Sequence, residues 1–419
     1  MHLCIFEDPL YRNFFPLVSL RPVSALRCGA DTLQAKAIAM LSPSSVSLSV
    51  RAQIALQTAD EFPGIAVNEL PEGPVACVNA RVIVDEAFVA ALRKRVKGPR
   101  ILVQGETIAA VVLDRRSLEE NPDLFIGGLL NVSAARRFPA EETTVRVVRY
   151  PWDLVRMNAE EIARDFRRRA ARTKKRIAGK VYPGAMLVAK KNILIGAGSR
   201  IKPGAVLDAE DGPIIIGKDV TVMPNAVIQG PASIGDGCVV KIGAKVYHGT
   251  SAGPHCKLGG EIESSILQSH ANKQHDGFLG HSYLGSWVNL GADTNTSDLK
   301  NTYGTVRVVV DGSDVDTGEM FVGLTMGDHS KTGINVMFDT GTIVGVGCNL
   351  YGAGLPPKFV PSFTWGQRGA FTGYDIEKCV ETARRVMARR QVSMSRAYEE
   401  LLRAVHAEAS SQAATRGAN

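Results

Sequence analysis

The stretch "ILIGAGSRIKPGAVLDAEDGPIIIGKDVTVMPNAVIQGPASIGDGCVVKIGAKV", residues 193–246, repeats an aliphatic residue every six positions. After a slip of three residues near 210 the period continues without a miss, so the repeating positions are Ile195, Ile201, Leu207, Ile216, Val222, Ile228, Ile234, Val240 and Val246. An α-helix repeats every 3.6 residues and a strand every two, so neither produces this pattern. A six-residue repeat predicts a left-handed parallel β-helix, in which three repeats close one triangular coil.

In such a coil the aliphatic residues fill the interior, and small residues let the chain turn at the corners. This explains why glycine is frequent, with 41 among 419 residues. Leu-Gly steps that begin at 279, 284 and 290, together with "TIVGVGCNLYG" (342–352), predict further coils. The stretch 298–330 breaks the period, and we expect it to leave the coil as loops.

The chain before the repeats alternates predicted strands with predicted helices, which indicates an α/β domain. The strands are 2–7, 75–84, 100–105 and 108–113, and the helices are 85–96 and 152–166. Residues 375–409 predict a pair of helices, and we expect the last ten residues to be frayed. The predicted parts are therefore an α/β domain (1–155), a basic helical linker (156–180), the β-helix (181–354) and a C-terminal helical extension (355–419).

Composition indicates a cytoplasmic protein. No run reaches the ~18 apolar residues of a membrane span, and Glu7 and Asp8 interrupt the stretch where a signal peptide is apolar. The seven cysteines contain no Cys-x-x-Cys pair, which favours reduced thiols over disulfides or a zinc site.

Much of the net charge of +7 lies in "RDFRRRAARTKKR" (164–176), where eight of thirteen residues are basic. We interpret this segment as a solvated helical linker, with attraction of anionic ligands as the alternative. Nucleic acid is disfavoured, because only Phe166 could stack on a base.

Six of the eight histidines lie between 248 and 329. Residues six apart occupy neighbouring faces of a β-helix, so we expect His275 and His281 to point to different faces. If every coil contains three full repeats, Lys257, His275 and Asp293 fall in one stack. A carboxylate beside an imidazole orients it and raises its basicity, so Asp293 is predicted to orient His275 as a general base. Without such a neighbour, a surface histidine is more often plainly solvated.

The motifs "FEDPLYRNFFPL", "YPWDL", "GHSYLGSWVNLGA", "SDLKNTYG" and "GDHSKTGINV" resemble those of bacterial sugar nucleotidyltransferases. These are shorter relatives of the bifunctional N-acetylglucosamine-1-phosphate uridyltransferase/glucosamine-1-phosphate acetyltransferases. The resemblance covers nearly the whole chain and implies a nucleotidyltransferase-like amino-terminal domain.

By this resemblance the catalytic base lies fourteen residues before the Asn of Val-Asn, which makes it His275 and not His281. The same register implies substrate contacts at Lys245, Glu261 and Asn289. It implies acetyl-CoA contacts at Ala292 and Lys331, and we expect Lys245, Lys257 and Lys331 to line one groove. The chain departs from the family at Glu263 (a substrate-binding Lys in the family), Phe278 (Tyr), Asp298 (Asn) and Asp293, which breaks a Gly-Ala-Gly-Thr step.

The implied activity is acetyl-CoA-dependent N-acetylation of an aminosugar phosphate in nucleotide-sugar or cell-envelope sugar synthesis, by a cytoplasmic homotrimer. The alternative is sugar-1-phosphate uridylyl transfer by the amino-terminal domain, alone or in addition. That domain would need UTP or another nucleoside triphosphate and Mg²⁺, but it lacks the family's Gly-rich phosphate loop, so we predict that it is degenerate. Its remaining candidates are cations for phosphates (Arg12, Arg21, Arg27, Lys36) and carboxylates for a metal (Glu7, Asp8, Asp85).

Two other classes are open. A zinc hydratase would use three histidines on a β-helix, and His270 and His275 have suggestive spacing. The positions one and two regular coils before them hold Ala252, Lys257, Ile234 and Val239, none of which binds zinc as a histidine does. A non-catalytic scaffold is the other class, but residues 272–335 hold more chemically active side chains than a scaffold needs.

Overall fold

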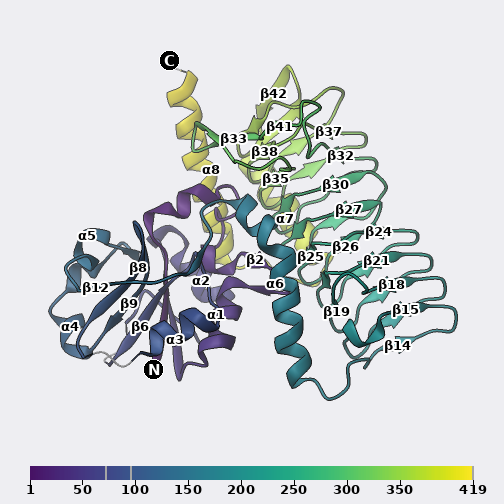
Figure 1. The fold of residues 1–419 in the computed structure, drawn as a ribbon. Helices are drawn as coiled ribbons and strands as arrows, with labels where there is room; N and C mark the ends of the chain where they lie inside the picture. Colours follow the sequence, from purple (N-terminus) through teal and green to yellow (C-terminus); the bar gives the residue numbers. More distant parts are fainter. Residues whose placement is uncertain (71–72, 95–96, 418–419) are drawn as a thin grey trace.

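The computed structural model describes residues 1–70, 73–94 and 97–417. It contains an α/β domain, a triangular prism of stacked strands and two C-terminal helices. Figure 1 shows the α/β domain on one side and the prism on the other, with the long helix α6 (Pro151–Arg172) running between them. No helix within the described residues is long and apolar enough to cross a membrane.

The α/β domain is built on one seven-stranded mixed sheet. Its order is β12 (Ala140–Glu142), β8 (Arg100–Gln104), β9 (Thr107–Leu113), β6 (Val75–Asn79), β1 (His2–Phe6), β4 (Ser45–Ser49) and β5 (Ala66–Val67). Its helices are α1 (Leu33–Leu41), α2 (Ala55–Glu61), α3 (Glu86–Arg93), α4 (Arg115–Glu119) and α5 (Val132–Ala135). The helix predicted over 85–96 thus ends at Arg93, and residues 95 and 96 lie outside the described residues.

Short elements connect this framework. They are the strands β2 (Arg27–Cys28), β3 (Asp31–Thr32), β7 (Val82–Ile83), β10 (Phe125–Ile126), β11 (Leu129–Leu130) and β13 (Arg146–Val147), and the 3-10 turns η1 (Pro9–Phe14), η2 (Val23–Ala25), η3 (Ala52–Ile54), η4 (Pro122–Leu124) and η5 (Lys190–Asn192).

The prism has three parallel faces, as the six-residue period predicts. The first face is β14 (Lys180–Val181), β17 (Arg200–Ile201), β20 (Thr221–Val222), β23 (Val239–Val240), β26 (Lys257–Leu258) and β29 (Asn272–Lys273), and it continues through Asn289 into β36 (Lys331–Thr332), β39 (Asn349–Leu350) and β41 (Thr364–Gln367). The strand β42 (Ala370–Gly373) pairs antiparallel with β41 at the end of this face. The second face is β15 (Met186–Val188), β18 (Val206–Asp208), β21 (Val227–Gln229), β24 (Lys245–Val246), β27 (Glu261–Glu263) and β30 (Phe278–Gly280), followed by β32 (Asn295–Thr296) and β37 (Met337–Phe338). The third face is β16 (Ile193–Ile195), β19 (Ile214–Ile216), β22 (Ala232–Ile234), β25 (Thr250–Ala252), β28 (Ile266–Leu267), β31 (Tyr283–Leu284), β35 (Thr325–Met326), β38 (Ile343–Val344) and β40 (Phe359–Val360).

The predicted left-handed β-helix architecture is confirmed, because every one of the nine repeating aliphatic residues is at most 2% exposed and lies in one interior cluster. The coils differ in length, however. Ile195 pairs with Ile216, and this longer coil absorbs the three-residue slip, whereas Val222 pairs with Val240 at the regular spacing of three repeats. Leu258 pairs with Lys273, so that coil is shorter than three full repeats.

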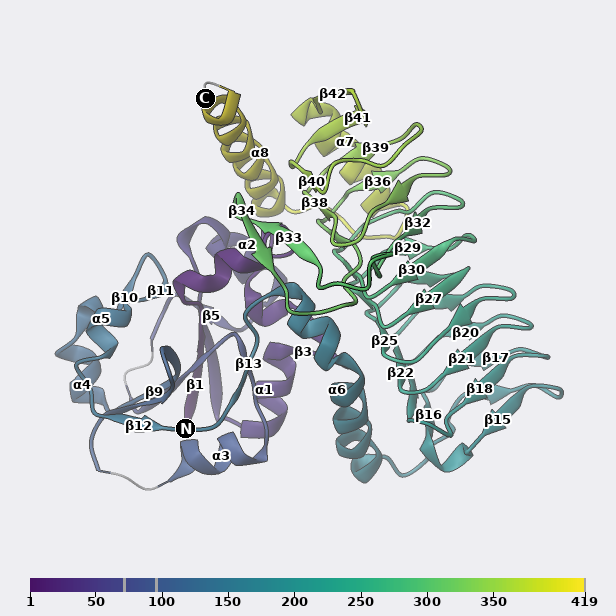
Figure 2. The same ribbon diagram turned by 45° about the horizontal axis from the view of Figure 1, so that its top comes forward.

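The insertion predicted over 298–330 lies between β32 and β35, and residues 325–330 have already returned to the coil. Tyr283 pairs directly with Thr325, and the intervening chain forms a hairpin of β33 (Arg307–Val310) and β34 (Ser313–Asp316). Figure 2 shows this hairpin beside the prism, on the side of the α/β domain and α8. The coils also continue past residue 354, because Val360 pairs with Val344 and extends the interior.

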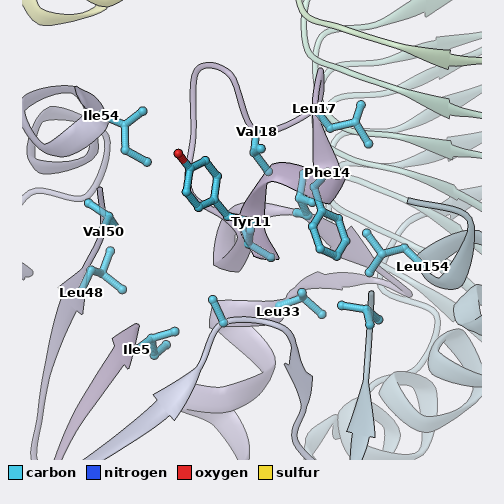
Figure 3. Packing of buried hydrophobic residues seen from close by; sticks show 14 of the residues in the cluster. Ile5, Tyr11, Phe14, Leu17, Val18, Leu33, Leu48, Val50, Ile54 and Leu154 are labelled. Carbon is cyan, nitrogen blue, oxygen red and sulfur yellow. The ribbon is translucent and has the colours of Figure 1, made fainter. Parts of the chain in front are cut away.

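The α/β domain, the prism and the C-terminal helices share one hydrophobic core. Figure 3 shows aromatic and aliphatic side chains of the α/β domain meeting Leu154 of α6. The same cluster includes Tyr283 and Trp287 of the prism and residues of both C-terminal helices, α7 (Ile376–Ala388) and α8 (Arg396–Gly417). The parts therefore form one continuous body, and the predicted boundaries at 155 and 180 do not separate independent hydrophobic cores. Helix α6 itself begins before them, at Pro151.

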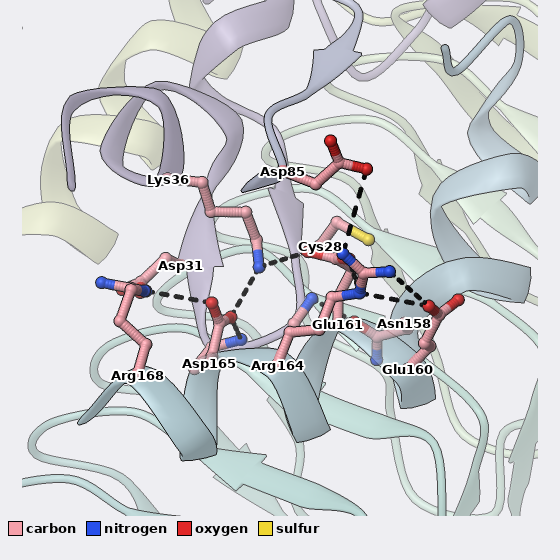
Figure 4. A network of polar contacts seen from close by, with 12 residues as sticks. Cys28, Asp31, Lys36, Asp85, Asn158, Glu160, Glu161, Arg164, Asp165 and Arg168 are labelled. Carbon is pink, nitrogen blue, oxygen red and sulfur yellow. Dashed lines mark hydrogen bonds and ion pairs between the residues drawn. The ribbon is translucent and has the colours of Figure 1, made fainter. Parts of the chain in front are cut away.

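Polar contacts fix α6 to both of its neighbours (Figure 4). The ammonium of Lys36 lies 2.8 Å from the Glu161 carboxylate and 2.6 Å from that of Asp165. Asn158 donates from Nδ2 to the carbonyl of Gly249 at 2.7 Å, while its Oδ1 accepts from the backbone N–H of Gly29 at 2.6 Å. Helix α6 is therefore hydrogen-bonded to the α/β domain and to the prism at the same level.

Candidate functional site

The predicted base lies on an exposed edge of the prism. We call this edge the ridge; it is the corner between the first and second faces at residues 241–244, 259–260, 274–277, 290–294 and 333–336. His275 is exposed on the ridge, and its imidazole makes no hydrogen bond within the part of the chain that the structure describes. His281 lies at the opposite edge of the second face, between β30 and β31. The two histidines thus occupy different corners, as the period predicts.

The loop that presents His275 is held from inside the prism by a lysine. Lys273 occupies an interior position, paired with Leu258, and is only 1% exposed. Its ammonium donates to the carbonyl of His275 at 2.5 Å and to that of Asp276 at 3.1 Å. Burial lowers the pKa of Lys273 to about 8, with Asp276 and Asp293 acting in the opposite direction. A cation at an aliphatic position costs desolvation, and here it fixes the loop carbonyls.

The predicted stack of Lys257, His275 and Asp293 is wrong, because the coils here are shorter than three full repeats. Lys257 pairs with Asn272, and the backbone N–H of Asp293 donates to the carbonyl of Asp276 at 3.1 Å. The Asp293 carboxylate accepts from Asn295 at 3.3 Å. Asp293 therefore lies on the ridge next to the His275 loop, without a hydrogen bond to the imidazole.

The second face brings together most of the residues that the resemblance marks as acceptor contacts. Lys245 and Glu261 are neighbours on successive coils, with 3.7 Å between ammonium and carboxylate, and Phe278 pairs with Glu261 on the next coil. Glu263 projects from the same strand as Glu261. This face therefore offers one exposed cation, one carboxylate and an aromatic ring beside the ridge, whereas Glu263 pairs with Gly280 at the opposite edge, next to His281.

The first face carries cations on the other side of the ridge. The pKa of Lys257 is lowered by burial and then by the nearby charges of Arg390, Lys241 and Arg389. Arg390, which follows α7, donates to the side chain of Asn272 at 2.8 Å. These four cations, Lys241, Lys257, Arg389 and Arg390, are called the cation cluster below. The two arginines come from the C-terminal extension, where no motif indicated them.

The remaining predicted residues are divided between the ridge and the first face. Asn289 accepts from Asn272 at 3.3 Å on the first face, and Ala292 is half-buried on the ridge. Lys331 also lies on the first face, where its ammonium donates to the carbonyl of His329 at 2.7 Å and burial lowers its pKa to about 8. The expectation that Lys245, Lys257 and Lys331 line one groove is therefore wrong, because Lys245 projects from a different face.

A contact between His281 and Asp298 was not predicted from the sequence. The Nδ1 atom of His281 lies 2.8 Å from Oδ2 of Asp298, and the imidazole stacks on Phe321 with 5.0 Å between ring centroids. A Cβ at Gly280 would lie 2.1 Å from the Asp298 carboxylate, so a glycine there is what admits this pair. The sequence signal that could have indicated this contact is a Gly-His step at a corner, Gly280-His281, followed by Asp298 one shortened coil later.

Four corner residues form a stacked ladder beside α8. The rings of His255 and His270 are 5.0 Å apart, and those of His270 and Trp287 are 4.0 Å apart. His329 continues the ladder and its Nε2 lies 2.8 Å from the hydroxyl of Tyr398. Burial, together with His255 and Arg390, lowers the pKa of His270 to about 4. The stacked rings are packing elements, and no group of three or more His, Cys, Asp or Glu among the described residues is arranged to hold a metal ion.

The charged residues that the sequence offered for a nucleotide are used in internal contacts. Of the cations, Arg21 pairs with Asp328, Lys36 with Glu161 and Asp165, and Arg27 donates to the carbonyl of Ala30, which leaves Arg12 exposed. Of the carboxylates, Glu7 is paired with Arg51, Asp8 with Arg81, and Asp85 caps α3. A carboxylate already neutralised by a buried guanidinium does not suit Mg²⁺, so the residues present do not fit this metal.

The fold and the comparisons define the class of architecture, in which a domain similar to nucleotidyltransferases is joined to a hexapeptide β-helix. Residues 3–174 match the family model described as sugar nucleotidyl transferase, and residues 213–248 match the bacterial transferase hexapeptide model of six repeats. The amino-terminal domain is therefore similar to the sugar nucleotidyl transferase family, and the resemblance inferred from the motifs is confirmed.

Curated relatives match over parts of the chain. The bifunctional protein GlmU of Synechococcus sp. (strain CC9311) is 27% identical over 169 residues, which are 40% of this chain and 32% of that protein. The uncharacterized acetyltransferase YaiX of Escherichia coli O6:K15:H31 (strain 536 / UPEC) is 26% identical over 171 residues, or 40% of this chain and 74% of that protein. The match thus spans about a third of the length of the GlmU relative.

Replacing Lys273 with methionine distinguishes the effect of this residue on the position of the His275 loop from its effect on the stability of the prism. Methionine restores an apolar interior, so we expect an unchanged or higher melting temperature. Loss of the ammonium frees the carbonyls of the His275 loop, and misplacement of a reacting group by about 1 Å can cost on the order of 100-fold in rate. We expect any reaction that uses the His275 imidazole to slow by about 10- to 100-fold. Leu258→Met, at the paired interior position, is the matched control and should retain activity; full activity of the Lys273 variant would contradict the positioning role.

Proposed function

We propose that the protein transfers an acetyl group from acetyl-CoA to the amine of an aminosugar phosphate, with the reaction at the ridge and His275 as the general base. The observation that supports this most is the position of His275, which stands exposed between the cation cluster of the first face and the acceptor-type residues of the second face. The side chains on one side of the imidazole thus suit coenzyme A, and those on the other side suit the aminosugar phosphate.

The cation cluster suits the phosphates of coenzyme A. Burial lowers the pKa of Lys257, and the charges of Arg390, Lys241 and Arg389 lower it further, so an anion between these four cations would relieve their mutual repulsion. Guanidinium groups bind phosphate oxygens through two parallel hydrogen bonds, which favours the arginines for this role. Lys331, whose ammonium is already held by a carbonyl, then contributes to packing under α7.

The second face suits an acceptor that carries both a phosphate and an amine. Lys245 would bind the phosphate, and Glu261 would attract the protonated amine or accept from sugar hydroxyls. Phe278 offers an apolar surface to a sugar ring. Because a carboxylate stands at 263, we propose an acceptor with less negative charge near that position than glucosamine-1-phosphate has.

The proposed chemistry is direct transfer. The amine, once it has lost a proton to solvent, attacks the thioester carbonyl while His275 takes the second proton from nitrogen. Collapse of the tetrahedral intermediate breaks the carbon–sulfur bond, and the imidazolium returns the proton to the departing thiolate. The products are an N-acetyl sugar phosphate and free coenzyme A. His281, which already has a charge partner in Asp298 and stacks on Phe321, is the rival base on this chain.

We further propose that the enzyme acts as a homotrimer in the cytoplasm. Three apolar side chains stand out from the ridge and second face, Ile242 at 67%, Ile334 at 69% and Met337 at 47% exposure. Packing of these against a neighbouring prism would enclose the ridge, which a reaction that must exclude water requires.

A second candidate function follows from the family match of residues 3–174, namely uridylyl transfer to a sugar-1-phosphate. It would need UTP and Mg²⁺, and no step is assigned to it because Glu7 and Asp8 are paired with buried arginines and Asp85 caps α3.

One paired assay tests the proposal. Purified protein is given acetyl-CoA with glucosamine-1-phosphate, other aminosugar phosphates or the unphosphorylated aminosugar, while free thiol is followed. It is separately given UTP and Mg²⁺ with N-acetylglucosamine-1-phosphate, while pyrophosphate is followed. We expect thiol release that depends on the aminosugar and no pyrophosphate. Absence of thiol release with every amine, together with pyrophosphate formation, would replace the acetyltransferase by the second candidate.

A further inference from the structure

The foot of the prism holds a basic pocket far along the molecule from the ridge site. It lies between the last turn of α6 with the loop after it and the first coils of the third face, where Figure 1 shows α6 running down to β14. Six cations line it, with Asp236 as the only carboxylate among the described lining residues; they are Arg168, Arg169, Arg172, Lys175, Arg176 and Lys218.

Most of these cations have no carboxylate partner. Arg168 and Arg169 share Asp31, which accounts for two of the six. Arg172, Lys175 and Lys218 form no ion pair within the described residues, and Arg176 donates only to the carbonyl of Lys191. Positive charge at the end of a helix stabilises its dipole by a few tenths of a kcal/mol to about 1 kcal/mol per charge. That effect explains one or two cations in the last turn, but not four unpaired cations around one cavity.

The floor of the pocket is apolar and rigid. Leu194 and Ile215 project from the third face and are 6% and 3% exposed, because they pack against Phe166 of α6. The cations surround this floor instead of lying on a convex surface, and no aromatic residue lines the pocket among the described residues. A concave site suits a small ligand, whereas single-stranded nucleic acid is bound on open surfaces with stacking aromatic rings.

We propose that this pocket binds a small ligand with two or more phosphate groups. Guanidinium and ammonium groups around one cavity match the several negative charges of a pyrophosphate, and Arg172 and Arg176 can each bind phosphate oxygens in pairs. The apolar floor accepts a nucleobase or another flat group attached to the phosphates. The site is separate from the ridge, so its occupancy does not depend on the acetyl-transfer proposal.

Calorimetric titration of the full-length protein at low salt tests this site. Inorganic pyrophosphate, ADP and coenzyme A are the three ligands, and we expect at least pyrophosphate or ADP to bind with a sub-millimolar Kd that weakens as salt is added. The double variant R172A/K175A should weaken that binding by about 10- to 100-fold, since it removes two charged donors. Both side chains are exposed, so the fold should be retained, as an unchanged melting temperature would show.

The matched control is R167A/K174A, which removes the same charge from two exposed neighbours that do not line the pocket. It should leave the affinity for pyrophosphate and ADP unchanged. Tighter binding of ADP than of pyrophosphate would show that the apolar floor contacts the adenine ring. Equal affinity for the two would show that the pocket recognises only the phosphates. Both results support the site. Equal loss of affinity in the two double variants, or no binding of any of the three ligands, would overturn it.

Discussion

His275→Ala is expected to lower kcat/KM for acetyl transfer by about 10²- to 10⁴-fold, the usual contribution of a positioned general base. The imidazole is exposed on the ridge and contributes no hydrogen bond among the described residues, so its removal should leave the melting temperature unchanged. The measurement is thiol release from acetyl-CoA with the best acceptor found in the paired assay.

His281→Ala is the matched control for the base, because it removes an imidazole from the other edge of the same face. It also breaks the contact with Asp298, so we expect a modest loss of stability in the 298–322 insertion and transfer of the same order as that of the unmodified protein. The reverse result, with the His281 variant inactive and the His275 variant active, would move the base to the His281–Asp298 pair and refute the assignment made from the family register.

Asp328→Asn is expected to reduce the free energy of unfolding by about 3–5 kcal/mol, because it leaves a buried guanidinium without its countercharge. Arg21 and Asp328 are 6% and 1% exposed, and Arg21 donates to Oδ1 of Asp328 at 2.9 Å and to the hydroxyl of Ser286 at 3.1 Å. Since Arg21 belongs to the α/β domain and Asp328 to the prism, both parts should lose protection. Urea unfolding gives the free energy, and peptide-level hydrogen exchange locates the loss.

Asp339→Asn is the control for this change. Its carboxylate also pairs with a cation, the ammonium of Lys358 at 3.3 Å, but both side chains are about two-fifths exposed. A surface pair contributes less than about 1 kcal/mol, so this variant should unfold almost as the unmodified protein does. If Asp328→Asn were equally mild, or if exchange increased in the prism alone, the α/β domain and the prism would not be joined through this contact.

The prism was predictable because its cause is local and repeated. Each aliphatic residue from Ile195 to Val246 buries itself in the same way, so the period reports the interior directly. The coil length was not predictable beyond Val246, because shorter corners leave the strands intact while they change which residues stack. This is why Asp293 was placed beside His275 by a count of regular coils and lies over Asp276 instead.

The sequence could predict which site residues are neighbours only where they lie on one strand or on two adjacent coils. Lys245 and Glu261 meet on the second face as the family register implies. Arg390 reaches the first face from the chain after α7, and Lys273 looks like an ordinary surface lysine until its interior position is known. The charged residues of the α/β domain were misjudged for the same reason, since Asp328 and Glu161 are distant in sequence and neutralise Arg21 and Lys36 in the fold.

A crystal structure of the protein with coenzyme A and an aminosugar phosphate would show whether acetyl transfer takes place at the ridge. We predict the coenzyme's phosphates at Lys257 and Arg390, the sugar against Phe278 and Lys245, and the thiol sulfur with the sugar amine next to the imidazole of His275. Coenzyme A bound elsewhere on the prism, with the ridge and the cation cluster empty, would rule out the ridge as the site of acetyl transfer.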